Sequence, residues 1–162
     1  MDVHKVLEYA LDREREGYVF FSDHAASAKH AAVAGVFKRL AAEEQAHIHY
    51  VESLIAALAS GAAVASPPVA EEDRRFFSER AASEMIEQTT SEAMVPDLPV
   101  LRMAYLIERD LAEFYADLAP KATGAAHDAL VKLARWEREH ERLFRTLHDR
   151  VFAEYSNMPW GG

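Results

Sequence analysis

Apolar residues along the chain recur at steps of three and four, which is the spacing of one face of an α-helix. This pattern predicts four long helices, at about residues 4–29, 34–59, 98–119 and 125–153. Half of the 162 residues are hydrophobic, so the chain can bury one full core. We therefore expect an all-α protein in which residues 1–162 form a single domain.

The segments between these helices predict how they are connected. Turns at about residues 30–33 and 120–124 would join the helices in pairs, giving two helical hairpins. Residues 61–95 are longer and contain prolines, with one stretch, from Glu71 to about Thr90, that fits a helix. We expect this segment to be a partly helical crossover that returns along a four-helix bundle.

The boundaries of the bundle follow from the same pattern. Asp97 directly precedes the third helix and is a candidate N-cap, since its carboxylate can accept from the first free backbone N–H groups. The bundle would span about residues 4–153, and residues 154–162 would form a C-terminal tail.

The two predicted hairpins repeat one another. A shift of 93 or 94 residues places the apolar stripes of the first half on those of the second. Each half carries one Glu on its first helix and a Glu-x-x-His motif on its second. The six repeated polar residues are Glu14, Glu44, His47, Glu108, Glu137 and His140. We expect them to converge near the middle of the bundle.

These six residues predict a metal site, because each lies in a helical stripe whose other members are apolar. Burying an unpaired charge costs several kcal/mol or more, so the carboxylates need compensation. Two divalent ions would balance four carboxylates. Oxygen and imidazole ligands suit iron or manganese, and zinc can also occupy such a site. The alternative, exposed Glu and His on charged helices, is disfavoured by the apolar neighbours.

The ligand roles follow from the division of the site between the halves. Glu44 and Glu137, from the two Glu-x-x-His motifs, are expected to bridge the metals. Glu14 and Glu108 would then bind one metal each, and His47 and His140 would be terminal nitrogen ligands.

Three further residues near the motifs are of interest. Gly17, one turn after Glu14, either lets a neighbouring helix or metal ligand come close or is a packing glycine. Glu43 and Glu139 flank the ligands, and we expect them to be solvated, with an outer contact to a ligand as the alternative.

Charge and composition exclude several classes of function. The formal net charge is −9, with 27 acidic and 18 basic residues, which disfavours binding to nucleic acids and to anionic membranes. The chain has no cysteine, which excludes disulfides, thiolate zinc sites, iron–sulfur clusters and cysteine nucleophiles. The N-terminus has no signal-peptide pattern and no apolar run reaches spanning length, so we expect a cytoplasmic protein.

Two motifs resemble a known family. The Glu-x-Glu-Gly-x-x-Phe-Phe run that begins at Glu14, with the first Glu-x-x-His motif, resembles the first half of a rubrerythrin-type, ferritin-like di-iron domain. The stretch from Glu108 to Tyr115, with the second motif, resembles the other half. The resemblance covers about residues 4–153. It implies two iron ions that react with hydrogen peroxide or dioxygen, often in a homodimer.

The sequence departs from that family at three points. Rubrerythrin peroxidases usually carry a rubredoxin domain with four cysteines; this chain ends after the bundle, so electrons are expected from a separate donor. Leu111 stands where these proteins have an extra Glu, three residues after the third-helix ligand. Phe21 replaces the commoner Tyr, although Tyr115 keeps its hydroxyl group and is the candidate to supply a proton or a hydrogen bond.

Three functions fit these observations. The first is an oxidoreductase that reduces hydrogen peroxide or dioxygen at a dinuclear iron centre. The second is a ferroxidase or iron-storage protein, whose acidic surface would help to attract cations. The third is a bundle that binds metal for stability alone.

Overall fold

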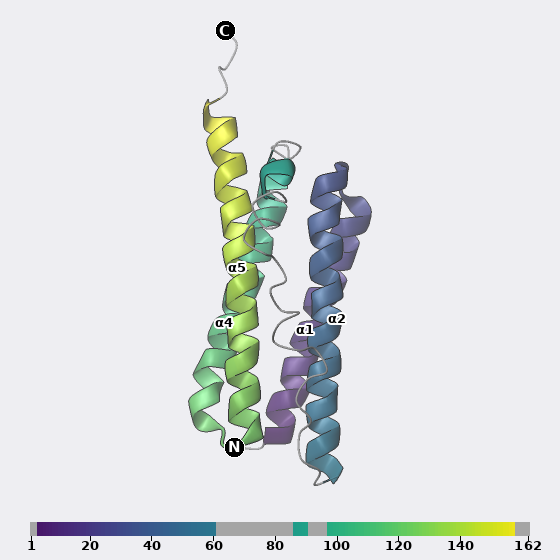
Figure 1. The fold of residues 1–162 in the computed structure, drawn as a ribbon, viewed down its shortest axis with the longest axis vertical. Helices are drawn as coiled ribbons and strands as arrows, with labels where there is room; N and C mark the ends of the chain where they lie inside the picture. Colours follow the sequence, from purple (N-terminus) through teal and green to yellow (C-terminus); the bar gives the residue numbers. More distant parts are fainter. Residues whose placement is uncertain (1–2, 61–85, 91–96, 158–162) are drawn as a thin grey trace.

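The computed structural model describes residues 3–60, 86–90 and 97–157, and these residues are almost entirely helical (Figure 1). The long helices are α1 (Val3–Ser27), α2 (Ala31–Ser60), α4 (Leu98–Leu118) and α5 (Ala125–Asn157), with the 3₁₀ helix η2 (Ala119–Lys121) between the last two. Residues 86–90 form one further helical turn. None of the described helices combines the length and the hydrophobicity that crossing a membrane requires.

The helices pack as two hairpins, α1 with α2 and α4 with α5 (Figure 1). Helices α2 and α4 run in the same direction, and α1 and α5 run in the opposite one. This polarity is the one that a crossover between the hairpins produces. The fold confirms the expected all-α bundle of two hairpins. Most of the predicted crossover, including the start of its helix at Glu71, lies outside the described residues.

The core consists of two apolar clusters at opposite ends of the bundle. One cluster joins the beginning of α1 and α5 to the end of α2 and α4, and includes Leu7, Leu54 and Leu133. The other lies at the far end, where Phe21 stacks on Phe144 with ring centroids 5.4 Å apart. The layer between the two clusters contains the repeated Glu and His residues.

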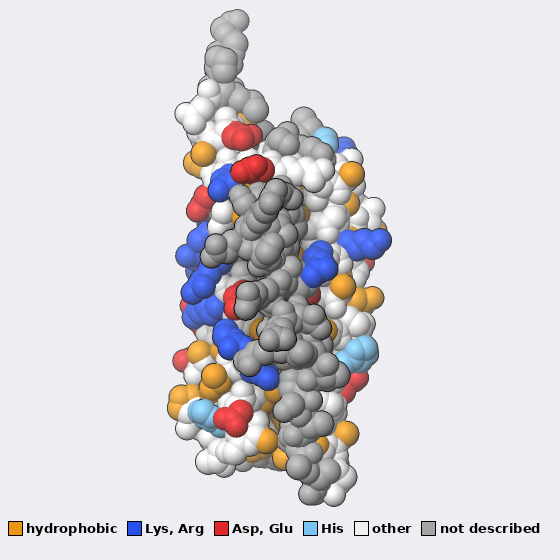
Figure 2. Space-filling model, in the orientation of Figure 1, with side chains coloured by type: hydrophobic (Ala, Val, Ile, Leu, Met, Phe, Trp, Pro, Cys, Tyr) orange, Lys and Arg blue, Asp and Glu red, His pale blue; other side chains and the backbone are white. Residues whose placement is uncertain are grey.

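Side-chain charge is not spread evenly over the molecule. Figure 2 shows Lys and Arg side chains along the α5 side of the face that α2 and α5 present. The net charge of −9 therefore does not make every face acidic.

Two boundaries differ from the sequence prediction by three residues or more. Helix α2 begins at Ala31 rather than at 34, because the alanines of the predicted turn favour a helix. Helix α5 continues to Asn157, so the predicted tail at 154–162 begins four residues too early. The Ser156 hydroxyl group donates to the Phe152 carbonyl oxygen at 2.8 Å. The first helix-breaking residue in the sequence after Ala153 is Pro159.

Asp97 stands at the N-cap position of α4, as predicted, but its side chain does not cap the helix. Its backbone is already helical, with φ −80° and ψ −21°, and its side chain makes no capping hydrogen bond. An N-cap normally has an extended backbone and accepts from the second or third residue of the helix. The second residue here is Pro99, which has no N–H to donate.

Candidate metal centre

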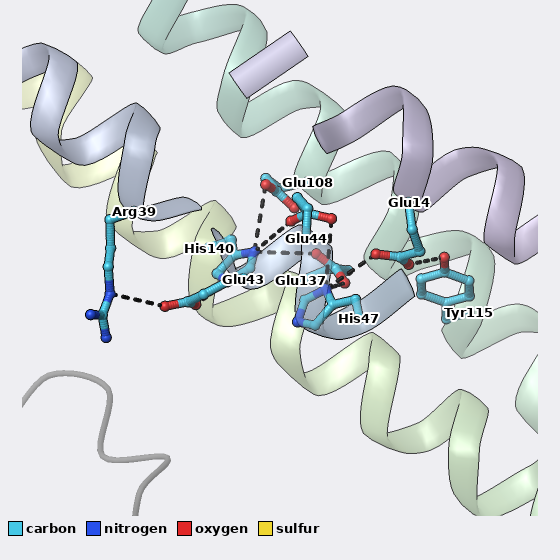
Figure 3. Close-up of polar contacts among 9 residues, drawn as sticks. All are labelled: Glu14, Arg39, Glu43, Glu44, His47, Glu108, Tyr115, Glu137 and His140. Atoms are coloured by element: carbon cyan, nitrogen blue, oxygen red, sulfur yellow. Dashed lines mark hydrogen bonds and ion pairs between the residues drawn. The ribbon is translucent and has the colours of Figure 1, made fainter. Parts of the chain in front are cut away.

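The structure brings the six repeated residues together in one layer of the bundle (Figure 3). Each hairpin contributes one Glu from its first helix and a Glu-x-x-His pair from its second. All six are buried: the four carboxylates have no exposed surface, and each histidine is 6% exposed. The donors are Glu14, Glu44, His47, Glu108, Glu137 and His140.

One half of the layer is centred on His47. Its Nδ1 atom lies 3.1 Å from Glu14 Oε2 and 3.1 Å from Glu137 Oε1. The same nitrogen lies 3.6 Å from Glu44 Oε2. Three carboxylates from α1, α2 and α5 therefore surround one imidazole nitrogen.

The other half is centred on His140 and has the same construction. Its Nδ1 atom lies 3.3 Å from Glu137 Oε2 and 3.4 Å from Glu44 Oε1. The third carboxylate is that of Glu108, whose Oε1 is 3.5 Å away. The two imidazole rings stack, with centroids 5.4 Å apart.

Two carboxylates are common to both halves. Glu44 and Glu137 each direct one oxygen toward His47 Nδ1 and the other toward His140 Nδ1. Glu14 and Glu108 contact one histidine each. The layer is thus two similar sets of donors that share two carboxylates, as expected for two hairpins related by an approximate twofold axis.

The donor set fits a metal ion. Within the described chain, both carboxylate oxygens of Glu44, Glu108 and Glu137 are buried without a hydrogen-bond partner, as is His140 Nδ1. Buried polar atoms normally have partners, so these atoms fit a site that binds a cation. The donor atoms form two groups, and within each group all the atoms lie within 4.8 Å of one another. One group comes from Glu44, Glu108, Glu137 and His140, and the other from Glu14, Glu44 and His47. Carboxylate oxygen and imidazole nitrogen are ligands that iron and manganese accept.

Burial decides the protonation of the two outer carboxyls. It raises the pKa of Glu14 well above the ordinary value, and the negative charge of Glu137 adds to this effect. Burial also raises the pKa of Glu108 well above the ordinary value, although His140 opposes it. Without a metal ion, both groups therefore hold protons at pH values where an exposed Glu is ionised.

The histidines and the shared carboxylates hold opposite charges. Burial would lower the pKa of His47, but Glu137 and Glu44 outweigh it and hold that pKa well above the ordinary range. The pKa of His140 is raised in the same way by neighbouring carboxylates. Burial acts against the ionised forms of Glu44 and Glu137, yet the histidines keep both pKa values low. The metal-free layer is then close to neutral, with protons in the place of metal ions.

Tyr115 lies beside the layer, on the side of His47. Its hydroxyl group donates a hydrogen bond to Glu14 Oε1 (Figure 3), and the side chain is fully buried. Burial, followed by the charge of Glu14, raises the pKa of Tyr115 well above its ordinary value. The hydroxyl group therefore stays protonated and acts as a donor.

Glu43 was expected to be solvated, but it contacts the centre. Its Oε2 accepts a hydrogen bond from His140 Nε2 at 2.8 Å, and its side chain is only 17% exposed. The partner lies on α5, so the helical pattern of α2 alone does not reveal this contact. Glu139, the other flanking Glu, is exposed as expected.

Gly17 provides space for the Glu44 side chain of the neighbouring helix, and such a close approach is one of the two roles predicted for it. A Cβ atom at this position would lie 3.3 Å from Glu44 Oε2, closer than most real Cβ contacts. On its other side, Gly17 lines a surface groove of about 460 Å³ between α1 and α4, where Leu111 also lies. Only a residue without a side chain leaves the shared carboxylate its full space.

The fold and the layer define a class: a four-helix bundle with a buried centre of carboxylates and histidines that can hold metal. The sequence profile of the rubrerythrin family matches residues 5–148. The chain belongs to the rubrerythrin family, a ferritin-like and iron-binding family. A search of curated proteins and a search of solved structures each gave no match.

Proposed function

We propose that the buried layer holds two iron ions and reduces hydrogen peroxide or dioxygen, with electrons from a separate donor. The observation that supports this proposal best is the position of Glu44 and Glu137, each of which directs one oxygen to each histidine. A carboxylate placed in this way can bridge two ions. A site for a single ion would not need two histidines that face the same two carboxylates.

The residues divide between two metal positions. Glu14 and His47 would bind one ion, Glu108 and His140 would bind the other, and Glu44 and Glu137 would be shared. Two divalent ions supply the positive charge that four carboxylates require in a buried site. The protons held by the metal-free layer would leave as the ions bind.

Two ferrous ions, when bound, supply the two electrons that convert one hydrogen peroxide and two protons to two water molecules. The protein contributes a closed, apolar surrounding, since both clusters of the core adjoin the layer. Tyr115 holds Glu14 through its hydroxyl group and keeps a proton next to the centre. The separate electron donor and a homodimeric assembly belong to the same proposal.

Metal analysis and rapid kinetics test this function. The natively purified protein is expected to hold two iron ions per chain, and the ferrous form to be oxidised faster by peroxide than by dioxygen in stopped-flow experiments. Glu44→Ala and Glu137→Ala should abolish fast oxidation, while Glu139→Ala, which alters an exposed Glu, should not. If Glu44→Ala and Glu137→Ala were oxidised as fast as Glu139→Ala and the wild-type chain, the proposal would be refuted.

Iron handling is the second candidate, favoured by the acidic net charge of −9, which attracts cations. In that case the same residues would oxidise iron that is then stored or passed on. Native mass and iron content separate the two functions. A shell of many subunits with far more than two irons per chain indicates storage, whereas a dimer with two per chain indicates the redox enzyme.

A further inference from the structure

The sequence repeat fails at two positions beside the centre, and the first is the residue that precedes the shared Glu. The residue before the shared Glu is Glu43 in the first half and Trp136 in the second, although a shift of 93 residues superimposes the ligands around them. Each of the two side chains crosses from its own helix to the histidine of the other half. The two histidines therefore have chemically different neighbours.

His140 is paired with a carboxylate. Its Nε2 atom donates to Glu43 Oε2 at 2.8 Å, while its Nδ1 atom faces Glu44, Glu108 and Glu137. The other oxygen of Glu43 lies 3.5 Å from Arg39 Nε, so the carboxylate is held between a guanidinium group and the imidazole (Figure 3). This pairing fixes a hydrogen on Nε2, so Nδ1 is the nitrogen that can offer a lone pair to the centre once its own proton has left.

His47 is paired with an aromatic ring. The indole of Trp136 stacks on the imidazole with centroids 4.7 Å apart and an interplanar angle of 7°. All the carboxylate contacts of His47 within the described chain are made by Nδ1. The stacked indole orients the ring, but its face offers no carboxylate to the Nε2 hydrogen.

Glu14 and Glu108, the carboxylates that each contact one histidine, also have different neighbours. On the His47 side, Glu14 Oε1 is engaged by the Tyr115 hydroxyl group. A shift of 94 residues places Phe21 opposite Tyr115 in the repeat, and Phe21 has no hydroxyl group to donate. Both oxygens of Glu108 are without a hydrogen-bond partner in the described chain. The His140 side therefore offers the more available carboxylate as well as the better supported imidazole.

We propose that Glu43 is a positioning residue that makes the His140 side the tighter of the two metal positions, so that the centre fills in order. A carboxylate hydrogen-bonded to a ligating histidine typically contributes 10- to 100-fold in metal affinity. The first ion would bind at Glu44, Glu108, Glu137 and His140, and the second would complete the His47 side. This inference rests on the proposed two-metal centre.

Variants with one histidine isolate the two positions. His47→Ala leaves the His140 side intact, and His140→Ala leaves the His47 side intact. Affinity is measured with Co²⁺ alone, without oxygen, by the visible absorption of the bound ion. In the His47→Ala chain, Glu43→Ala should weaken Co²⁺ binding by about 10- to 100-fold, and Glu43→Gln, which keeps one acceptor oxygen, by less. In the His140→Ala chain, neither change should alter affinity more than about twofold. Glu139→Ala is the matched control and should have no effect in either chain.

Two results would overturn the inference: an equal loss of affinity in both single-histidine chains, or no loss in either. If those chains bind too weakly to titrate, the chain with both histidines decides, because Glu43→Ala should then weaken the first Co²⁺ step and leave the second unchanged. A wild-type chain that binds no Co²⁺ would end the proposed function itself. If the wild-type chain binds two Co²⁺ ions and the Glu43 variants bind both with the same affinities, only this inference fails.

Discussion

The hydroxyl group of Tyr115 shows how one atom in an apolar surrounding affects the centre. It donates to Glu14 Oε1 where water does not reach, since both side chains are fully buried. A hydrogen bond to a charged or buried group contributes more than one at the surface, because a lost partner leaves a group without solvation. Tyr115 therefore affects both the stability of the bundle and the properties of Glu14.

Tyr115→Phe is expected to lower the free energy of unfolding of the metal-free protein by about 1–3 kcal/mol. It should also lower metal affinity by roughly tenfold, because Glu14 loses the group that orients it. Chemical denaturation and Co²⁺ titration measure the two effects. Tyr9→Phe, at a tyrosine that is 47% exposed, is the control and should change neither quantity. A Tyr115 variant with wild-type values in both measurements would show that the hydrogen bond has no such role.

At this scale the sequence identifies the six central residues and proposes Tyr115 as a neighbour, but it gives the contact of Glu43 only as an alternative. The repeat singles out Glu44 and His47 because the same pair recurs at Glu137 and His140 within apolar stripes. No repeated motif marks the contact of Glu43 with His140, because this contact depends on how one hairpin packs against the other. A periodic pattern reports the face of a helix, and it does not report the partner across the core.

Helix α1 shows how a whole element is adapted to the site. It carries Glu14 into the centre and, one turn later, presents Gly17 to Glu44. A glycine inside a helix costs about 0.5–1 kcal/mol relative to alanine. This cost is offset by the space that the shared carboxylate requires.

Gly17→Ala is expected to weaken metal binding, because the added Cβ meets Glu44 Oε2 at 3.3 Å and Glu44 is confined by its other contacts. Gly35→Ala in α2 is the matched control, since nothing lies within 4 Å of a Cβ at that position. It should raise the free energy of unfolding by about 0.5–1 kcal/mol and leave metal affinity unchanged. Metal titrations and denaturation curves of both variants measure these effects; equal affinities would show that Glu44 can move away.

The helices themselves follow from the sequence, and their ends do so less well. Steps of three and four fix which residues face the core, so all four long helices were predicted. The alanines near 31–34 carry no turn signal, and the chain after Ala153 has no helix breaker until Pro159, which explains the errors at α2 and α5. Asp97 has the residue type of an N-cap, but its backbone is helical rather than extended, and Pro99 removes one of the two donors that it could use.

At the scale of the molecule, the apolar packing is divided by the polar layer. Each end of the bundle has its own cluster, one around Leu54 and Leu133 and the other around Phe21 and Phe144. The clusters hold both hairpins together at either end, whatever occupies the middle. The metal centre is therefore expected to add stability to a fold that the core already specifies.

Removal of metal by chelation should lower the melting temperature while the far-ultraviolet circular dichroism stays helical. The loss corresponds to about 4 kcal/mol when the free metal had been 1,000-fold above its dissociation constant. Complete loss of helicity on chelation would instead indicate a site that is needed for folding.

The same comparison should depend on pH. The pKa values of His47, His140, Glu14 and Glu108 are raised in the metal-free protein, so the folded state binds more protons than the unfolded state. Their stabilising contribution is complete below the unfolded pKa values and is lost as the pH rises through the folded ones. Glu44 and Glu137 act oppositely, and their contribution is lost only in acid. The stability gained on metal binding is therefore expected to grow as the pH rises above the ordinary histidine pKa of about 6.5. A constant difference would contradict this proton balance.

The stacking of Trp136 on His47 has a practical consequence for experiments. The chain has two tryptophans, and the other, Trp160, lies outside the described residues. An indole stacked on the histidine of one proposed metal position is a natural fluorescent reporter, whose emission a paramagnetic ion at His47 would quench. Occupancy of that position can thus be followed in the unlabelled protein, separately from the total amount of ion taken up.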